Sequence, residues 1–530
     1  MNKKARCEFW ASATLTVVCV AACSPASSAA EPIAVAPAKM PRIGSVDERF
    51  QSFNIEMVEV TGGRFWAPYS KPAGAEPEPA PAAKLSTPGI APAAFRTRAP
   101  IDLANPRLRK LAAALGPAYV RVSGTWANST YFHDSYDPAP ATPPAGFGGV
   151  LTRRQWRGVV DFSRAVNAGI VTSFAVSSGV RDVNGVWTPD QARKFLEFTK
   201  AIGGSIAAAE FFNEPTFAAM GGAPKGYDAA AYGRDFLVFR EFVKKAAPEM
   251  TILGPGSVGE ASPLAAGFAL VKTQDMMTAT GGGVDAFSYH FYGAVSQRCA
   301  FMADAPQTTP EAALSEDWLS RTDRDEAFYA TLRDRFEPGK PLWLTETGEA
   351  ACGGNRWAAA FVDSFRYLDQ LGRLAKRGVQ VVAHNTLAAS DYGLIDEATL
   401  APRPNYWSAV LWRKLMGETV LDAGTAPAPG VHLYAHCLRG HPGGVALLAI
   451  NADREASHDL SVPIGADRYS LTAKGLLETS VELNGRELKT GAQDALPEMT
   501  GEPAHAGLVK LAPASITFLA FPNAENASCR

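Results

Sequence analysis

The sequence lacks a marked excess of either charge, a compositional bias and internal repeats. It holds 51 Lys and Arg against 53 Asp and Glu, so no global positive field is present that would hold nucleic acid. Its 47% hydrophobic and 20% charged residues are ordinary for a globular protein, which excludes a disordered or fibrous chain. The N-terminal apolar stretch, Ala11–Ala22, is too short to span a bilayer on its own.

The N-terminus has the order of an export signal. Residues 1–30 begin with basic side chains, continue with the apolar stretch and end in small residues. Two cleavage sites fit, because Val20-Ala21-Ala22-Cys23 is similar to a bacterial lipobox and Ser28-Ala29-Ala30 has the small-x-small form. We expect an exported protein that is periplasmic, secreted or anchored at the cell surface through a lipid on Cys23.

Cysteine is scarce, and its distribution fits export. Removing the signal segment takes Cys7 and Cys19, and it takes Cys23 as well if cleavage follows Ala30. The four cysteines that remain are Cys299, Cys352, Cys437 and Cys529. An even number in an exported protein predicts disulfides, and four cysteines allow three connectivities.

Residues 46–418 alternate between short apolar runs and helical patterns. The apolar runs are Ser52–Val58, Ala118–Gly124, Ile170–Ser178, Ile206–Pro215, Thr251–Ser257, Val284–Gly293, Pro341–Gly348 and Val379–Leu387. The helical patterns are Leu151–Ala168, Pro189–Ile202, Tyr227–Ala247, Asp323–Phe336 and Arg356–Arg377. Eight such units predict an α/β protein with a (β/α)8 TIM barrel; the alternative is an open doubly wound sheet.

Three segments differ from this alternating pattern in composition or in periodicity. Residues 31–45 and 66–100 are rich in Pro and Ala, which propagate neither a helix nor the interior of a sheet. We expect the first to be a tether and the second a long surface loop. In residues 419–530, short alternating runs between turn residues predict a C-terminal antiparallel β-sandwich domain.

Two predicted strands end in glutamates. The fourth ends in Asn213-Glu214-Pro215 and the seventh in Thr345-Glu346-Thr347. Catalytic groups of TIM barrels lie at the C-terminal ends of strands, and a charge after an apolar run is costly unless it is paired or used. Paired carboxyl groups perform glycoside hydrolysis, with a separation of roughly 5 to 5.5 Å in retaining enzymes.

The motifs around these glutamates resemble glycoside hydrolase family 79, the heparanase and β-glucuronidase group. The likeness covers roughly residues 50–530 and lies in an ordered set of motifs. They are Ala118–Thr125, Phe212–Pro215, Tyr289–Tyr292, Pro341–Thr347, Cys352–Gly354, Val381–His384, Asp391–Asp396, Asn405–Trp407, Leu433–Cys437 and Ser480–Gly485. The resemblance implies the fold already predicted and a retaining hydrolase of β-glucuronosyl linkages.

The resemblance also implies roles for single residues. Glu214 would be the acid/base and Glu346 the nucleophile, with Asn213 bonding the sugar 2-hydroxyl and Tyr292 bonding the nucleophile. The other residues expected to bind substrate are Gly353, Gly354 and Tyr392 for the glucuronate carboxylate, and Thr125 and Glu56 for the sugar. Backbone N–H groups of glycines suit an anion because glycine permits close approach.

Two disulfide pairings are predicted, one from the resemblance and one from position in the barrel. Cys437 and Cys529 match the C-terminal bridge of the family. Cys299 and Cys352 each follow a strand that carries a functional motif, at the same face of the barrel, which favours a second bridge beside the cleft. The segment at 66–100 is shorter than the linker excised from mammalian heparanase, so we expect a single-chain enzyme without maturation.

We expect heparan sulfate, cleaved internally, as the first substrate. Whichever bond is cleaved, the partner should be a glycan that contains glucuronic acid. An exo-β-glucuronidase acting on other glucuronosides is the alternative, and the near-neutral charge favours it, because a sulfated polymer calls for a basic cleft. A hypothesis from a different functional class is a surface lipoprotein that binds glycans without catalysis. We expect no cofactor, no metal and a monomer.

Three further patterns have competing interpretations. Gly254, Gly256 and Gly259 formally match a dinucleotide fingerprint, but a glycine-rich barrel loop fits their position in the chain better. The histidines and cysteine between His432 and His441 have spacings compatible with zinc, but their predicted strand separates them too widely. The basic clusters Arg107–Lys110 and Arg153–Arg157 are either solvated helix faces or contacts for a polyanionic chain.

Overall fold

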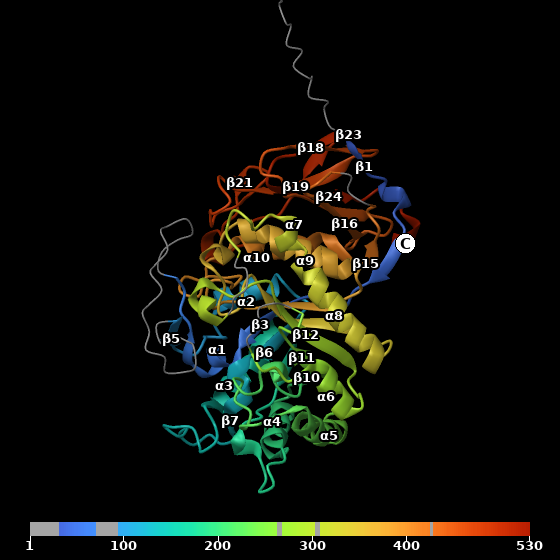
Figure 1. The fold of residues 1–530 in the computed structure, drawn as a ribbon. Coiled ribbons are helices and arrows are strands. Elements are labelled where there is room, and N and C mark those ends of the chain that lie inside the picture. Colours follow the sequence, from blue (N-terminus) through green and yellow to red (C-terminus); the bar gives the residue numbers. More distant parts are fainter. Residues whose placement is uncertain (1–30, 70–93, 262–267, 303–307, 425–427) are drawn as a thin grey trace, which may run out of the picture. The chain divides into compact units, whose positions relative to one another are not determined.

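The computed structural model describes residues 31–69, 94–261, 268–302, 308–424 and 428–530. The predicted signal, residues 1–30, lies outside them. Residues 32–530 form one compact unit, whose strands and helices are labelled in Figure 1. Within the described ranges, no helix combines the length and the apolar character needed to cross a membrane.

Eight parallel strands close into a barrel, in the order β10-β11-β12-β13-β14-β3-β6-β9. Their bounds are β3 (Gln51–Glu56), β6 (Ala118–Ser123), β9 (Ala168–Ser173), β10 (Ile206–Glu210), β11 (Thr251–Ser257), β12 (Ala286–Tyr292), β13 (Leu342–Gly348) and β14 (Val381–His384). Each strand overlaps one of the eight predicted runs. The barrel is therefore confirmed, and the open sheet is wrong because the first and last strands of an open sheet would stay unpaired.

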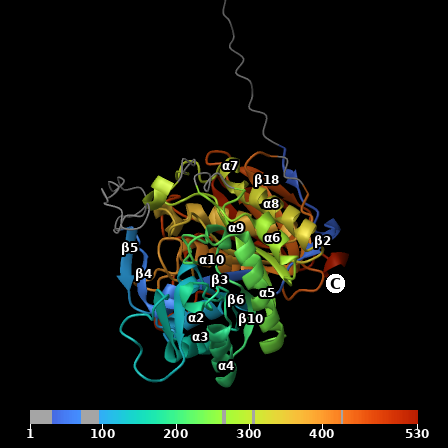
Figure 2. The same cartoon turned by 60° about the horizontal axis from the view of Figure 1, so that its bottom comes forward.

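Helices surround the strands, as Figure 2 shows for α3 to α6 around β3, β6 and β10. The helices are α1 (Met57–Thr61), α2 (Pro106–Ala113), α3 (Arg153–Ala165), α4 (Asp190–Ala201), α5 (Ala229–Ala246), α6 (Thr273–Thr280), α7 (Glu316–Leu319), α8 (Arg321–Phe336), α9 (Val362–Lys376) and α10 (Pro404–Leu415). In α3, Thr152 and Gln155 form a capping box. Trp156 and Val159 are buried, as an amphipathic helix on a sheet requires.

The interior of the barrel has two layers of opposite character. The lower layer is an apolar cluster of Val171, Ala208, Leu253, Ala286, Trp343 and Val381, with Tyr119 packed against it. Two residues further along β6 and β10 stand Arg121 and Glu210, which are also buried. Because side chains two apart on a strand share a face, the same strands carry the apolar layer and the charged layer above it.

The C-terminal domain packs two sheets against each other. The larger sheet contains β2 (Arg42–Ser45), β15 (Met416–Leu421), β16 (Val431–Leu438), β17 (Val445–Asn451), β24 (Ser515–Phe521), β19 (Ala466–Thr472), β20 (Glu482–Leu483), β21 (Arg486–Glu487) and β22 (Glu502–Ala504). The smaller sheet contains β1 (Ile33–Ala34), β18 (His458–Val462) and β23 (Gly507–Leu511). An apolar core that includes Leu447, Leu460 and Leu519 fills the space between them, which confirms the predicted sandwich.

Two Pro/Ala-rich segments differ from expectation. The expected tether, residues 31–45, supplies β1 and β2, which pair with β18 and β15. Both strands lie at sheet edges, where neighbouring prolines are tolerated. The expected loop 66–100 has strands at its ends, because β4 (Gly63–Trp66) pairs with β5 (Phe95–Arg98); residues 70–93 lie outside the described ranges. We call β4 and β5 the side hairpin.

Candidate active site

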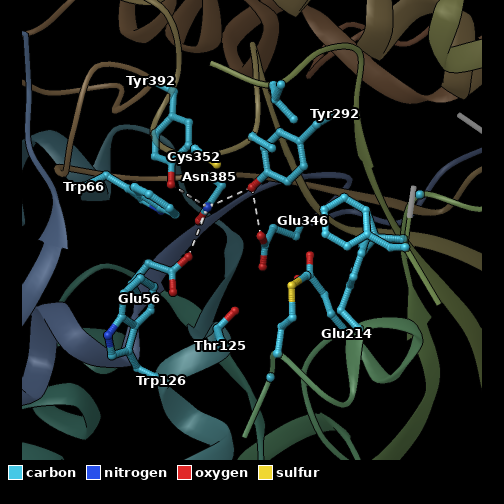
Figure 3. A pocket seen from close by; sticks show the side chains of 18 of the residues that line it. Glu56, Trp66, Thr125, Trp126, Glu214, Tyr292, Glu346, Cys352, Asn385 and Tyr392 are labelled. Carbon is cyan, nitrogen blue, oxygen red and sulfur yellow. Dashed lines mark hydrogen bonds between the residues drawn. The ribbon is translucent and has the colours of Figure 1, made fainter. Parts of the chain in front are cut away.

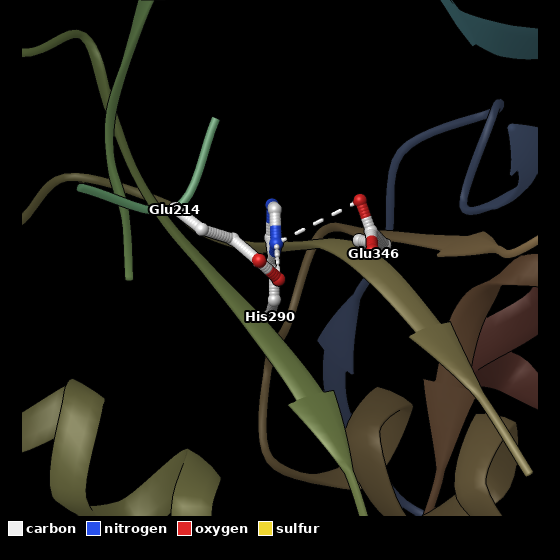
Figure 4. Close-up of side chains that lie close together, drawn as sticks. All are labelled: Glu214, His290 and Glu346. Carbon is white, nitrogen blue, oxygen red and sulfur yellow. Dashed lines mark hydrogen bonds and ion pairs between the residues drawn. The ribbon is translucent and has the colours of Figure 1, made fainter. Parts of the chain in front are cut away.

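Glu214 and Glu346 meet at the C-terminal ends of β10 and β13. A carboxylate oxygen of Glu214 and one of Glu346 lie within 4.8 Å of each other. Glu214 has a left-handed backbone with φ of 50°, and the N–H of Phe217 donates to its carbonyl at 2.9 Å. Such a conformation is uncommon outside glycine and clusters at functional sites. The chain turns sharply here and directs the carboxyl group into the barrel mouth (Figure 4).

Two donors hold the carboxylate of Glu346. Arg121 Nη1 donates to Oε2 at 2.7 Å, and the hydroxyl of Tyr292 donates to Oε1 at 2.8 Å. The group is 5% exposed, so these bonds form away from bulk water. Hydrogen bonds to both oxygens fix the orientation of this carboxyl group.

His290 lies between the two glutamates (Figure 4). Its Nδ1 is 3.1 Å from Glu214 Oε1 and 3.8 Å from Glu346 Oε2. Burial disfavours the charged ring, but the charge of Glu346 and the interactions with Glu210 and Glu214 outweigh burial and raise the pKa of His290 to about 9. The imidazole is therefore a cation at neutral pH.

The contact of His290 with Arg121 fits a charged ring. Arg121 Nη2 lies 3.2 Å from His290 Nε2. The guanidinium nitrogen Nη2 carries only two hydrogens. They are donated to Glu210 Oε2 at 2.8 Å and to Asn213 Oδ1 at 2.7 Å. No hydrogen remains for the imidazole, so Nε2 can keep its own proton, directed toward Glu210 Oε1 at 3.7 Å.

The environments of Glu214 and Glu210 shift the pKa values of the two groups in opposite directions. Burial raises the pKa of Glu214, the hydrogen bond from His290 opposes this, and the charge of Glu346 adds to the rise, with a net upward shift. The pKa of Glu210 is lowered, because the interactions with Arg121, His290 and Thr345 outweigh the effect of burial. Arg121 contacts both Glu210 and Glu346, which offsets part of the cost of burying these groups.

Glu56 and Asn385 form a second polar group on the far side of the cavity. Asn385 Nδ2 donates to Glu56 Oε1 at 3.1 Å and lies 3.0 Å from the Tyr292 hydroxyl and 3.2 Å from the Tyr392 hydroxyl (Figure 3). Burial and the charge of Glu346 raise the pKa of Glu56 well above its usual range. Gly124, with φ of +90°, leaves room for this carboxyl, since a Cβ there would come within 1.6 Å of Glu56 Oε2.

The cavity in front of these groups has a volume of about 280 Å³. Of the predicted residues, Glu56, Thr125, Glu214, Tyr292, Glu346 and Tyr392 line it. Asn213 lies beneath, held through its backbone by Asn128, whose Oδ1 accepts from the N–H at 2.8 Å. The structure thus brings seven of the nine predicted site residues together.

The predicted glycine loop is positioned differently. Ala351 and Cys352 line the cavity where Gly353 and Gly354 were expected. The carbonyl of Gly353 accepts from the N–H of Asp391 at 3.0 Å, and the N–H of Gly354 donates to the Ala350 carbonyl at 3.1 Å. A substrate carboxylate would have to displace that last bond, so capture by these glycines stays a prediction.

Sequence reasoning missed four residues of the site, which are Arg121, Glu210, His290 and Asn385. Arg121 and His290 stand inside quoted motifs, two residues before Ser123 and Tyr292. They could have been found because side chains two residues apart on a strand share a face, which places Arg121 and His290 on the inner face of their strands. The side hairpin was also missed; its Trp66 stacks on Phe95 with ring centroids 4.5 Å apart, and both line the cavity.

The four cysteines pair as predicted, Cys299 with Cys352 and Cys437 with Cys529. The first bridge lies beside the cavity, which Cys352 lines. Close to it, Arg298 pairs with Asp391 and covers the ring of Tyr69 at 4.1 Å. The Tyr69 hydroxyl lies 2.9 Å from Ser296 Oγ, so this residue anchors the segment that directly follows β4.

The residues of the zinc-like and dinucleotide-like sequence patterns have other roles in the structure. Within the described ranges, the only group of three potential ligands is Glu214, His290 and Glu346, and their side chains bond one another and Arg121 or Tyr292. His432 instead contacts Asp369, and Cys437 is in a disulfide. Gly254 and Gly256 lie inside β11, so neither the fingerprint turn nor the expected loop forms there.

The chain is similar to known glycoside hydrolases and heparanases. Residues 97–372 match the family model described as glycosyl hydrolase family 79, N-terminal domain. The chain is 28% identical to heparanase of Mus musculus, with 81% of this chain and 88% of that protein covered. It is 26% identical to heparanase-like protein 1 of Arabidopsis thaliana (81% and 86% covered) and 24% identical to hyaluronoglucuronidase of Hirudo nipponia (81% and 92%).

Solved structures share the fold. A 4-O-α-L-rhamnosyl-β-D-glucuronidase from Fusarium oxysporum superposes with a TM-score of 0.60 at 13% identity, covering 92% of this chain and 100% of that one. A GH51 arabinofuranosidase from Xanthomonas axonopodis pv. citri gives a TM-score of 0.59 at 16% identity, covering 91% and 97%. At such identities the likeness concerns architecture alone.

Proposed function

This chain belongs to glycosyl hydrolase family 79, and we propose that it hydrolyses β-glucuronosyl linkages with retention of configuration. The observation that carries the proposal is the pair Glu214 and Glu346, of which one carboxyl oxygen each lies within 4.8 Å of the other. Arg121 and Tyr292 bond Glu346, whereas His290 contacts Glu214. That separation suits a double displacement and leaves no room for the water of an inverting mechanism.

The reaction proceeds in two steps. Glu214 donates its proton to the glycosidic oxygen while Glu346 attacks the anomeric carbon, so the aglycone leaves as an alcohol and a glycosyl-enzyme forms. Glu214, now ionised, takes a proton from water, whose oxygen attacks the same carbon and releases Glu346. Arg121 and Tyr292 support both steps, because each bonds the nucleophile before attack and after release.

The remaining polar residues would recognise the sugar. Arg121 occupies Asn213 Oδ1, which directs the amide nitrogen of Asn213 toward a 2-hydroxyl. Glu56, Thr125 and Tyr392 line the cavity and are assigned to the other sugar oxygens. Gly353 and Gly354 are assigned, with Tyr392, to the glucuronate carboxylate.

Relatives named heparanase support heparan sulfate, cleaved internally, as one substrate. The geometry favours the alternative, an exo-acting enzyme that removes single glucuronosyl residues. Trp66 and Tyr392 lie across the cavity from Glu214, on the side away from the leaving group (Figure 3). An internal cleavage needs that side open for the preceding sugar, and the Trp66–Phe95 stack stands there.

The purified protein should be tested on heparan sulfate and on a chromogenic β-glucuronide, with product size and anomeric configuration followed in time. Free β-glucuronate as the first product supports retention and exo action, whereas an early fall in chain length supports endo action. Formation of the α-anomer first contradicts the mechanism. A silent glycan-binding protein would hydrolyse neither substrate.

We also propose that the protein is exported by residues 1–30 and acts as a monomer. The basic, apolar and small-residue order of that segment supports export. The mass of the mature N-terminus distinguishes the two cleavage sites, because a lipid on Cys23 adds fatty acyl mass that the variant Cys23→Ser would lack.

A further inference from the structure

The turn that carries Glu214 also presents apolar side chains to the cavity. Phe217 and Met220 line the cavity within six residues of the glutamate. The N–H of Phe217 donates to the Glu214 carbonyl and the N–H of Met220 to the Phe217 carbonyl, both at 2.9 Å. Hydrogen bonds along one tight turn therefore fix both side chains relative to the acid.

A third apolar side chain joins them from another segment. The ring of Phe268 meets that of Phe217 edge to face, with centroids 5.7 Å apart and planes at 81°. The N–H of Val271 donates to the Thr216 carbonyl at 3.1 Å and holds this segment against the turn. We call Phe217, Met220 and Phe268 the apolar collar. Met220 is 49% exposed and both rings are half-buried, so the collar presents apolar surface that a ligand could cover.

Among the residues that the structure describes, the cavity wall presents carboxyl groups and no cation. Glu56, Glu214 and Glu346 line it, and of the described residues that do so none is Lys, Arg or His. Arg121 and His290 lie beneath, with side chains 2% and 0% exposed, and are engaged with Glu210 and the two catalytic glutamates.

The two basic clusters face elsewhere. Arg153 pairs with Asp134 at 2.8 Å, Arg107 pairs with Asp494, and neither lines the cavity. A sulfate group bound next to Glu214 would thus meet carboxyl groups and apolar carbon, and it would lose hydration without gaining a partner.

We propose that the apolar collar is the aglycone subsite and selects an uncharged aglycone with an apolar or aromatic face over a sulfated one. This inference rests on the proposed function. The acid must touch the glycosidic oxygen, so the leaving group lies against the residues fixed to the acid. Contact with the collar desolvates apolar surface, whereas a sulfated sugar receives no compensating charge.

The test compares two β-glucuronosyl disaccharides that differ only in 6-O-sulfation of an N-acetylglucosamine aglycone, which is uncharged when unsulfated. For the wild-type enzyme at low salt, kcat/KM should favour the unsulfated disaccharide by about tenfold or more. Raising the salt concentration should narrow this ratio, because screening weakens repulsion between charges. Equal or faster turnover of the sulfated disaccharide overturns the inference and leaves the proposed function intact.

A charge at the collar should shift the preference. Met220→Arg should raise the sulfated-to-unsulfated ratio of kcat/KM by about tenfold, while Val183→Arg, at a fully exposed position outside the cavity lining, should leave it unchanged. A ratio measured within one enzyme cancels differences in folding. An unchanged ratio in Met220→Arg contradicts the assignment of the collar.

The apolar contact has its own readout. Methyl, benzyl and 2-naphthylmethyl β-glucuronides carry alkoxide leaving groups of similar basicity, so KM should fall along the series for the wild type and much less for Phe217→Ala. A flat series overturns the apolar contact. Absence of turnover on every glucuronoside, with no difference from Glu346→Gln, overturns the proposed function and this inference together.

Discussion

The two layers inside the barrel are built on the same strands and have opposite consequences. The lower layer, with Leu253 and Trp343, removes apolar surface from water and stabilises the fold. The upper layer buries Arg121, Glu210 and His290 at a cost in desolvation that their mutual attraction largely offsets. In this barrel, the residues that stabilise the fold and those that form the polar site therefore lie only two positions apart on the same strands.

The largest effect is expected in the charged layer, from Glu346→Gln. The amide cannot form the glycosyl-enzyme, so kcat should fall on the order of 10⁴-fold or more, while the thermal midpoint stays near that of the wild type. The control is Glu48→Gln, a partly exposed carboxyl outside the site. Turnover of a chromogenic β-glucuronide by Glu346→Gln at even a tenth of the wild-type rate would exclude Glu346 as nucleophile.

The matching change in the apolar layer is Leu253→Ala. Leu253 is fully buried, so the lost contacts and the cavity should lower the free energy of unfolding by about 2 to 5 kcal/mol. Urea unfolding measures this loss. Below the unfolding transition kcat should stay within about threefold of the wild type. A large loss of kcat in a stably folded variant would show that the two layers are coupled.

Tyr292→Phe should have an intermediate effect. It removes the hydroxyl that donates to Glu346 Oε1 at 2.8 Å, a bond to a charged group worth about 1.5 to 3 kcal/mol. We expect kcat to fall roughly 10- to 100-fold. Because Tyr292 also stabilises the carboxylate released from the glycosyl-enzyme, pre-steady-state kinetics should show a burst of aglycone. A fall in kcat without a burst would place its role in the first step alone.

The smallest effect is expected in a pH profile, from His290→Gln. Glu214 must be protonated to act as the acid, so kcat/KM falls as pH rises through its pKa. The interaction with His290 lowers the pKa of Glu214, so removing the imidazolium should raise that pKa and move the alkaline limb to higher pH. His133→Gln, on β7 (Thr130–His133), is the control. A downward shift would contradict the assignment.

The meeting of Glu214 and Glu346 and the barrel could be predicted from the sequence because their signals are local. The run before Glu346 is apolar over the length of one strand, and β11 has the predicted bounds because turn residues enclose it. The carboxyl ends of parallel strands in a barrel meet at one mouth whatever the rest of the chain does. Placing Glu214 and Glu346 together therefore required no knowledge of distant contacts.

The partners of that pair were decided by tertiary structure. Arg121 reaches Glu346 across 225 positions of sequence, and Asn385 reaches Glu56 across 329. No local pattern specifies such pairs, since each depends on strand register and on how far a side chain extends. The same holds for Trp66 and for residues 33–45, whose strands form only against edges that other segments provide.

The sequence by itself thus determined the architecture, the two glutamates and the cysteine pairs. The tertiary structure alone decided the charge balance beneath the glutamates, the occupied N–H of Gly354 and the apolar collar beside Glu214. The physical reason is range. Hydrophobic periodicity acts within one strand or helix, whereas burial, pKa and the character of a cavity wall depend on atoms that meet only after the barrel has closed.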